Sequence, residues 1–373
     1  MRALFVASPL VGHVLPLVPL ATALRDAGHD VVLATGGDGA AVVRSCGLEV
    51  RDVVPGLRFG PVFLGRMLRH PVLLPRELAG GGGTDAVGLL FAAVCERMAD
   101  GVMAVAEDCR SDIVVHEPLA AAGALAAAAR GVPAVTVDAS LFDAEELLRS
   151  TTRHLGTTAR RRGVEAFPAP AEMLVTAPPS LIGDRRGRPM RYVPVAGSGP
   201  AAPEELVRPG SRPRIIVSRS TVADRRPDRL MRSVVAAAAD SDVEVVLVHP
   251  DARSLRRPLP GNVRTADWLP FAQAFPAAAG VVHHGGAGTV LTALAAGIPQ
   301  LVVPGAGDRA TNAQLVAARR VGLAVPVEQI TASDLERLVS DPALARTARE
   351  VADEMAAMPD PADLVEPLVS LAG

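Results

Sequence analysis

The segment 280–304 alternates two short apolar runs with a glycine-rich turn, and this alternation constrains the fold more than any other feature of the chain. The letters HHGGAGT at 283–289 separate the two runs, the second of which occupies 300–304. We expect a helix between the runs, from about Thr289 to Gly297. A strand, a turn, a helix and a strand in this order form a parallel α/β unit. Its polar groups gather at the carboxyl ends of the strands, where ligands bind in open sheets.

The glycine-rich turn predicts an anion site at the start of that helix. Unbonded backbone N–H groups and the positive end of the helix dipole would meet there, and both favour a diphosphate. Gly285, Gly286 and Gly288 would let the backbone approach the anion closely, because no Cβ stands in the way. Turns of this kind also serve packing alone, so the turn by itself leaves both interpretations open.

A longer string of letters is more specific. HHGGAGT at 283–289, IPQLVVP at 298–304 and a D-x-x-x-N loop from Asp308 to Asn312 follow one another in the chain. In this order they resemble the donor-binding signature of GT-B glycosyltransferases that use nucleotide sugars, above all the actinomycete enzymes that glycosylate natural products. The resemblance implies an α/β protein of the GT-B fold, with two Rossmann-like, doubly wound parallel-sheet domains facing across a cleft.

The composition is that of a globular protein. Hydrophobic residues make up 49% of the 373 residues and charged residues 21%, and this length is comfortable for two domains. The net charge of −2 and the aromatic content of 3% give no reason to expect a nucleic-acid partner.

The cysteines and the apolar runs bear on location. Cys46, Cys95 and Cys109 are odd in number and lack paired spacing, which favours a reducing cytoplasm. The first residues enter a strand without a signal-peptide pattern, and no apolar run reaches the ~20 residues of a membrane span. We expect a soluble, cytoplasmic protein with no membrane partner.

Strands and helices alternate in both halves of the chain, which predicts two parallel sheets. Strands are expected at 3–7, 30–34, 48–53, 113–115, 134–137, 215–217 and 243–248, and helices at 15–27, 39–46 and 119–130. A stretch rich in Pro, Gly and Ser marks a linker. The expected organisation is an acceptor-binding domain at 1–195, a linker at 196–213, a donor-binding domain at 214–358, and, by resemblance, a tail at 359–373 that crosses back to the first domain.

Two regions interrupt the alternation. Residues 55–84 are rich in Pro, Gly and Leu, and residues 139–168 mix helix formers with three consecutive arginines. Insertions at the carboxyl edge of a sheet often carry binding function. The resemblance implies that both regions shape the acceptor pocket, and mobile loops without a function are the alternative. As acceptor contacts we predict Gly12, Phe63, Asp138 and Phe142.

His13 is the strongest candidate for a catalytic residue. It ends the turn SPLVGH, which lies between the first expected strand and the first expected helix and lacks the G-x-G-x-x-G pattern of a dinucleotide site. The surrounding G-H-x-x-P-L letters match the family's catalytic histidine, which implies that His13 is the general base. Glu117 follows the strand at 113–115 and would orient His13 as the acid of a triad does, although the family usually has Asp there. His116 and Asp138 are weaker alternatives for this role, and a helix-terminal carboxylate is the structural alternative for Glu117.

The resemblance also assigns the donor site. His284, Gly286, Gly288 and Thr289 would contact the diphosphate, Trp268 would stack on the nucleobase, and Asp308 would contact a sugar hydroxyl. Ser220 and Thr221, at the end of an expected strand, could add hydrogen bonds to the phosphates. Plant relatives follow the aspartate with glutamine, whereas this chain has Arg309, which puts recognition of a glucose-type sugar in doubt.

No metal site or cofactor is expected. His283 and His284 are adjacent, but successive strand residues point to opposite faces, so the two rings are not expected to share an ion. The co-substrate implied by the resemblance is a nucleotide sugar linked to dTDP or UDP, and the second partner is a small-molecule aglycone. A monomer or a homodimer is expected.

These residues together predict an inverting glycosyltransferase that moves a deoxysugar to a hydroxyl of a hydrophobic natural-product aglycone. Two alternatives remain open at this point. One is a nucleotide-sugar 2-epimerase of the same fold, which would need further acid/base carboxylates near the sugar. The other is a non-catalytic partner that binds the nucleotide or the aglycone and assists a true transferase.

Overall fold

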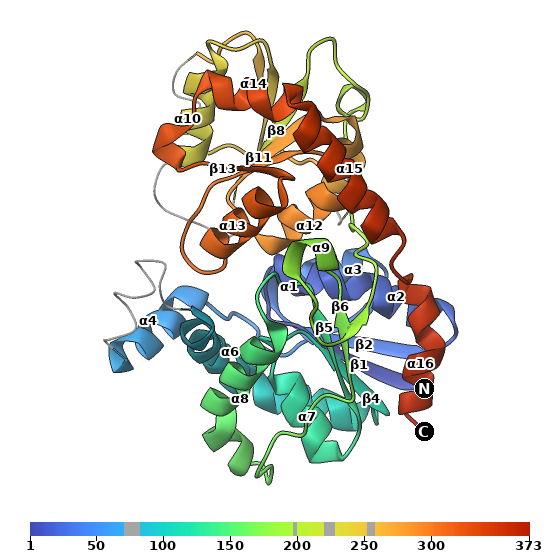
Figure 1. Ribbon diagram of the computed structural model, residues 1–373. Helices are drawn as coiled ribbons and strands as arrows, with labels where there is room; N and C mark the ends of the chain where they lie inside the picture. The colour runs from blue at the N-terminus through green and yellow to red at the C-terminus, as the bar shows by residue number, and fades with distance from the viewer. Residues whose placement is uncertain (71–82, 197–199, 220–227, 252–257) are drawn as a thin grey trace. The chain divides into compact units, whose positions relative to one another are not determined.

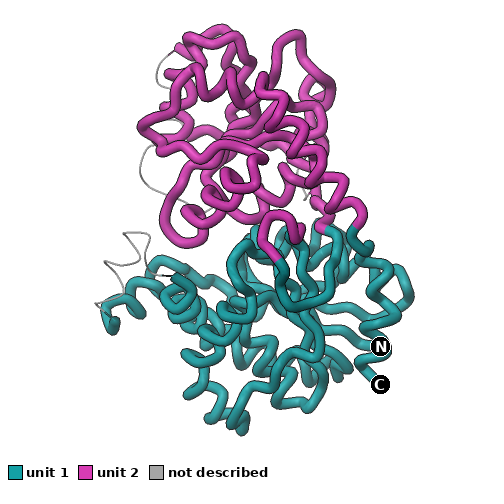
Figure 2. The backbone as a smooth tube through the Cα atoms, viewed as in Figure 1, with its two compact units in different colours: residues 1–177, 184–191, 358–373 teal, residues 178–183, 192–357 magenta. Residues whose placement is uncertain are grey.

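The chain folds into two compact units, which are described separately. The computed structural model describes residues 1–70, 83–196, 200–219, 228–251 and 258–373. Unit 1 comprises Met1–Ala177, Asp184–Arg191 and Met358–Gly373, and unit 2 comprises Pro178–Gly183 and Tyr192–Ala357 (Figure 2). Within those described stretches, no helix combines the length and the apolar character that crossing a membrane requires.

Unit 1 is built on a seven-stranded parallel sheet in the order β3-β2-β1-β4-β5-β6-β7 (Figure 1). The chain order reverses between β1 and β4, which are hydrogen-bonded neighbours. This reversal opens a crevice at the carboxyl ends of these two strands, where ligands bind in doubly wound sheets. The strands are β1 Arg2–Val6, β2 Asp30–Thr35, β3 Glu49–Asp52, β4 Ile113–His116, β5 Ala134–Asp138, β6 Glu172–Val175 and β7 Arg188–Pro189.

The helices of unit 1 pack against this sheet and against one another. Leu4 and Val114 of the sheet share a core with Met98, Val102 and Leu125, because strands with apolar side chains on both faces need cover on both. The helices are α1 Val11–Val14, η1 Leu15–Leu17, α2 Val18–Asp26, α3 Gly37–Ser45, α4 Phe59–Arg69, α6 Gly83–Asp108, α7 Ala122–Arg130, α8 Ala144–Arg160, η5 Pro361–Leu364 and α16 Val365–Leu371.

Unit 2 repeats the plan with a six-stranded parallel sheet in the order β10-β9-β8-β11-β12-β13. Its reversal lies between β8 and β11, which pair along their length. The strands are β8 Arg214–Ser218, β9 Glu244–Val248, β10 Val263–Ala266, β11 Gly280–His283, β12 Gln300–Val302 and β13 Gly322–Ala324. The two sheets confirm the expectation of two parallel-sheet α/β domains.

The helices of unit 2 leave a core on each face of the sheet. Val217 and Val282 belong to one core, and Ile216 and Val281 belong to the other, because successive strand residues face opposite sides. The helices are α9 Pro179–Ile182, η2 Glu204–Leu206, α10 Arg229–Ala238, α11 Phe271–Ala274, η3 Phe275–Ala277, α12 Ala287–Ala295, α13 Arg309–Arg319, η4 Val327–Gln329, α14 Ala332–Ser340 and α15 Pro342–Ala356.

The structure corrects several expected boundaries. The first helical segment begins at Val11 rather than at residue 15, and it continues through a 3₁₀ turn with Pro16 at its start, so His13 lies inside a helical turn. The helix expected from residue 119 begins at Ala122, and the helix expected from Thr289 begins at Ala287. The helices that begin at Val11 and Ala287 therefore include residues of the candidate site, whereas the helix that begins at Ala122 starts after them.

The regions 55–84 and 139–168 contain regular helices, which the sequence analysis did not expect. They include all of α4 and all of α8, and α6 begins inside the first region and runs for 26 residues. The long helix α6 was not predicted because its buried residues surround much of the helix, which weakens the periodic pattern of apolar residues in the sequence. In α8, Leu148, Thr151, Leu155 and Ala159 recur at the spacing of a buried helix face.

Candidate active site

His13 and Glu117 come together at the reversal point of the first sheet. His13 follows β1, Glu117 follows β4, and these strands are neighbours with Val6 opposite His116. The Nδ1 atom of His13 lies 3.3 Å from Oε1 of Glu117. The histidine side chain is 26% exposed and the glutamate side chain 8%. The imidazole therefore reaches the surface while the carboxylate supports it from below.

Further hydrogen bonds hold the Glu117 carboxylate in place. Oε1 accepts from the backbone N–H of Ser8 at 3.2 Å and from its hydroxyl at 2.6 Å, and Oε2 accepts from the N–H of Leu119 at 2.8 Å. Burial alone would raise the pKa of Glu117, but His13 and these donors outweigh burial and lower it. The carboxylate is therefore ionised and tightly positioned. Ser8 was not singled out from the sequence, because only the fold brings it to Glu117.

The two alternative partners of His13 point elsewhere. Nδ1 of His116 lies 3.0 Å from the carbonyl oxygen of Glu117, its Nε2 atom lies 3.5 Å from the Thr136 hydroxyl, and burial lowers its pKa. Asp138 is 1% exposed and lies beside Ser140 and Arg185. Of Glu117, His116 and Asp138, Glu117 is the one whose side chain lies against the His13 ring.

An aromatic patch lies beside His13. The ring centroids of His13 and Phe91 are 5.2 Å apart, and those of Phe63 and Phe91 are 5.8 Å apart. Phe91 and Leu119 belong to a small apolar cluster against which Phe63 and Phe142 pack, and we call this cluster with its packing residues the aromatic patch. Gly12 is exposed next to His13. Phe63 and Phe142 thus belong to the same patch as Phe91, which lies against the His13 ring and was not identified from the sequence.

Asp138 contributes to the patch indirectly. Its carboxylate accepts from the N–H of Ser140 at 2.8 Å and from its hydroxyl at 2.7 Å, and the Arg185 guanidinium lies 3.4 Å away. Arg185 in turn donates to the carbonyl oxygens of Leu141 and Phe142. The carboxylate is buried rather than presented at the surface, so any effect of Asp138 on an acceptor passes through the position of Phe142.

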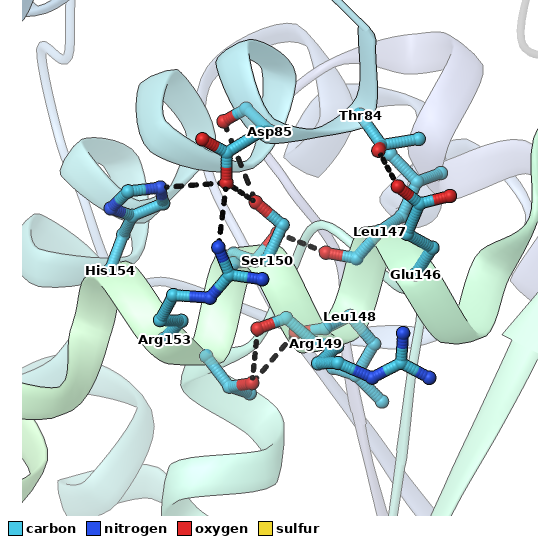
Figure 3. A network of polar contacts seen from close by, with 11 residues as sticks. Thr84, Asp85, Glu146, Leu147, Leu148, Arg149, Ser150, Arg153 and His154 are labelled. Atoms are coloured by element: carbon cyan, nitrogen blue, oxygen red, sulfur yellow. Dashed lines mark hydrogen bonds and ion pairs between the residues drawn. The ribbon is translucent and has the colours of Figure 1, made fainter.

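A polar network fastens α8 to α6 behind the patch (Figure 3). Asp85, near the start of α6, accepts from the Ser150 hydroxyl at 3.0 Å and lies 3.2 Å from both Arg153 and His154 of α8. Burial would raise the pKa of Asp85, but the hydrogen bonds from Ser150 and His154 lower it. Both helices contribute residues to the aromatic patch, so this network supports one wall of it.

The glycine turn of unit 2 has the geometry of an anion site. Gly285 adopts a φ of +87°, which favours glycine, and Gly286 precedes the first turn of α12 as its N-cap without a capping side chain. The first N–H groups of α12 therefore face the carboxyl edge of the sheet. The Tyr192 hydroxyl donates to the Gly288 carbonyl oxygen at 3.3 Å and supports this turn from behind. Thr289 lies within the first turn and is partly exposed.

The two adjacent histidines have different surroundings. Nε2 of His283 lies 2.9 Å from Oε1 of Gln300, its Nδ1 accepts from the N–H of Gly285, and burial lowers its pKa to about 4. His284 packs with its Nε2 under Gly286, and its buried Nδ1 has no hydrogen-bond partner within the described part of the chain. Burial, then the charge of Arg309, lowers the pKa of His284 to about 3, so this ring is neutral.

The loop after β12 is tied to the glycine turn. Asn312 is fully buried, and its amide donates to the carbonyl oxygen of Gly285 at 2.7 Å and to Oδ2 of Asp308 at 2.8 Å. Asn312 thus joins the loop to the glycine turn. Asp308 precedes α13 as its N-cap and is partly buried close to the turn.

Trp268 is a further donor candidate in unit 2. Trp268 follows β10 and is 45% exposed, so its ring is available for stacking. Ser220 and Thr221 lie outside the described residues. Among the residues that the structure describes, no three His, Cys, Asp or Glu side chains are grouped as a metal site.

Comparison with known proteins places the chain in a family. The family model described as Erythromycin biosynthesis protein CIII-like matches with its N-terminal domain over residues 22–220 and with its C-terminal domain over residues 232–371. The elloramycin glycosyltransferase ElmGT of Streptomyces olivaceus is 36% identical over 98% of this chain and 96% of its own length.

Two solved structures share the fold over the whole chain. The glycosyltransferase SnogD from Streptomyces nogalater has a TM-score of 0.87 at 35% identity, covering 100% of both chains. The Streptomyces glycosyltransferase SsfS6, solved with thymidine diphosphate, has a TM-score of 0.84 at 28% identity, covering 99% of both chains. The chain therefore belongs to the erythromycin biosynthesis protein CIII-like family and is an actinomycete natural-product glycosyltransferase of the GT-B fold.

Proposed function

We propose that this glycosyltransferase transfers a deoxysugar from a dTDP- or UDP-linked donor to a hydroxyl of a hydrophobic aglycone, with inversion at the anomeric carbon. The observation that carries the proposal is the contact of 3.3 Å between Nδ1 of His13 and Oε1 of Glu117. It leaves Nε2 of His13 as the atom that takes the proton of the acceptor hydroxyl.

The proposed reaction is a single displacement. His13 accepts the hydroxyl proton while the acceptor oxygen forms a bond to the anomeric carbon. The bond between that carbon and the diphosphate oxygen breaks, and the nucleotide diphosphate leaves with the electron pair. Glu117 holds the tautomer of His13 that presents Nε2 and stabilises the imidazolium that forms. General base catalysis of this kind contributes ~10²–10⁴-fold.

The acceptor class follows from the surroundings of His13. Phe63 and Phe142, which are only partly buried, pack on the buried Phe91 beside the base. An aglycone with a flat, apolar ring system would bury its faces on these rings and present a hydroxyl to His13. The need for a base favours O-transfer, because a hydroxyl must lose its proton as it attacks.

The donor would lie on unit 2. Its diphosphate would take hydrogen bonds from the N–H groups at the start of α12 and from the neutral ring of His284, whose buried Nδ1 finds no hydrogen-bond partner among the residues that the structure describes. Trp268 would stack on the base, and Asp308 would contact the sugar. The presence of thymidine diphosphate in the related SsfS6 structure supports a thymidine nucleotide here.

A release assay tests the proposal. Wild type and His13→Ala are given dTDP- and UDP-sugars with a panel of polyketide aglycones, and nucleotide diphosphate and glycosylated product are followed by mass. The proposal expects product from the wild type, and its loss in His13→Ala with dTDP binding retained. Full activity of His13→Ala would remove the proposed mechanism.

The same assay separates the alternative functions. A helper protein would yield no product from the wild type, and its activity would appear only with a second transferase. A 2-epimerase would alter the sugar of the donor without an acceptor. Slow hydrolysis of the donor in the absence of aglycone favours the transferase, because the same site would then activate water.

A further inference from the structure

Arg309 packs directly on the glycine turn. A Cβ placed on Gly285 would lie 3.2 Å from both the Cβ and the carbonyl oxygen of Arg309, and one placed on Gly305 would lie 3.1 Å from its Cδ. The two glycines therefore leave the space in which the first turn of α13 and the stem of Arg309 approach the start of α12. Figure 1 shows α12 and α13 side by side within unit 2.

Buried hydrogen bonds hold this arrangement. The Asn312 amide, one turn along α13, donates to the carbonyl oxygen of Gly285 and to Asp308. Arg309 is the residue that follows Asp308, at the first position of α13. Its backbone is thus fixed against the glycine turn, and its side chain starts from a defined place beside that turn.

A diphosphate bound at the glycine turn requires positive charge to balance its own. A departing nucleoside diphosphate carries at least two negative charges, whereas helix N-termini supply only about half a charge each. The ring of His284 is neutral, because its pKa is lowered to about 3, and Arg309 is one of the causes of that lowering. The Arg309 guanidinium is therefore close enough to the turn for its positive charge to act there.

We propose that Arg309 brings a full positive charge to the donor site and binds the diphosphate of the donor and of the leaving nucleotide. The inference rests on the proposed function, since it needs a nucleotide diphosphate at the start of α12. In this arrangement His284 and the helix N–H groups orient the diphosphate by hydrogen bonds, and Arg309 neutralises it. Guanidinium groups suit this role because their donors match phosphate oxygens in pairs.

Binding measurements on four proteins test the proposal: wild type, Arg309→Gln, Arg309→Lys and Arg319→Gln. The last variant is the matched control, because Arg319 lies ten residues along the same helix, about 15 Å away by helical rise. Binding of dTDP is measured by calorimetry at low and high salt, and binding of thymidine, which lacks phosphates, by ligand-observed NMR. UDP and uridine form a parallel pair.

The expected result is a loss that depends on the phosphates. Arg309→Gln should weaken dTDP binding by about tenfold or more, reduce its salt dependence and leave thymidine binding unchanged. Arg309→Lys should recover part of the loss, and Arg319→Gln should bind as the wild type does.

Other outcomes contradict the inference in recognisable ways. Equal dTDP binding by wild type and Arg309→Gln would overturn it while leaving the proposed function intact. A parallel loss of thymidine binding, or no recovery in Arg309→Lys, would assign Arg309 a structural role instead. A wild type that binds neither dTDP nor UDP would refute the proposed function itself.

Discussion

At the scale of single residues, the site depends on how a carboxylate is held. Glu117 accepts from Ser8 and Leu119 and still faces His13, so its position is determined by the backbone on both sides of the sheet reversal. The carboxylate can therefore stabilise a charged imidazole without moving.

Replacing Glu117 by glutamine should slow the reaction without unfolding the protein. The amide keeps an oxygen for Ser8 or Leu119, but it carries no charge to stabilise the imidazolium of His13. We expect kcat to fall about 100-fold while dTDP affinity stays the same. Steady-state kinetics and calorimetric titration measure the two quantities. Glu107→Gln, a substitution at an exposed position of α6, is the control and should match the wild type. A kcat for Glu117→Gln within twofold of the wild-type value would argue against a catalytic pair of His13 and Glu117.

Asp138 should give the protein a measurable pH dependence of stability. Burial raises the pKa of Asp138 to about 6, so the folded state holds a proton that the unfolded state releases near pH 4. This contribution to stability is present below about pH 4 and is lost as the pH rises to about 6. Asp138→Asn removes it, so the free energy of unfolding of the variant relative to wild type should increase between pH 4 and 6. Urea unfolding at four pH values measures this difference, and a constant difference would contradict the assignment.

Some residues of the candidate site could be predicted from the sequence and others could not, for a physical reason. His13, Glu117 and His284 each follow an apolar strand, and parallel strands place the residues after them at one edge of the sheet. Phe91 lies inside a long apolar helix with no local mark of function. Only its contact with the His13 ring, across 78 residues of chain, reveals that it belongs beside the base.

At the scale of elements, the start of α12 depends on Gly286. A Cβ at this position would lie 2.8 Å from Nε2 of His284, so an alanine must displace the imidazole ring. We expect Gly286→Ala to weaken dTDP binding by about tenfold, because the ring and the helix N–H groups would no longer point at the same diphosphate.

Calorimetric titration of Gly286→Ala with dTDP measures this effect. Gly261→Ala is the matched control, because a Cβ there meets nothing within 4 Å and the residue is exposed in the same unit. Unchanged dTDP affinity in Gly286→Ala would mean that the donor does not use this turn.

The joint between α12 and α13 is a buried amide. Asn312→Asp keeps the shape of the side chain but loses the amide hydrogens that reach Gly285 and Asp308, and it places two carboxylates together. The free energy of unfolding should fall by about 1–3 kcal/mol, the cost of buried groups left without partners. Denaturant unfolding at pH 7 measures the loss; stability equal to wild type would show that the joint contributes little.

Whether a strand or helix could be predicted depends on the pattern of apolar residues in its sequence. The sheet strands are short apolar runs bounded by turn residues, and the structure confirms that they form two parallel sheets. The helices α4, α6 and α8 were not expected. In α6 the buried residues surround much of the helix and leave a weak helical pattern, whereas α8 does carry buried residues at helical spacing. Their packing depends on long-range contacts such as those of Asp85 with α8, which local patterns do not contain.

At the scale of the whole molecule, each unit has its own sheet and its own core, and the chain returns to unit 1 at its end. The Arg191 N–H donates to the carbonyl oxygen of Pro359, and the Arg191 side chain pairs with Asp360, so the two passages of chain are joined within unit 1. Residues of the candidate base belong to unit 1 and residues of the candidate donor site to unit 2. This division predicts that the two substrates stabilise different parts of the protein.

Thermal unfolding with dTDP tests that division. The single tryptophan, Trp268, and the single tyrosine, Tyr192, both belong to unit 2, so the fluorescence of these two residues reports the unfolding of that unit alone. A ligand that binds only the folded form stabilises it by RT ln(1 + [L]/Kd), about 2.7 kcal/mol at 100 times Kd. We expect dTDP at this concentration to raise the fluorescence midpoint by a few degrees. Circular dichroism, which reports both units, should separate into a shifted and an unshifted transition.

Equal shifts of every part of the circular dichroism signal would mean that the units unfold as one body. An unshifted fluorescence midpoint, with dTDP bound, would place the nucleotide outside unit 2.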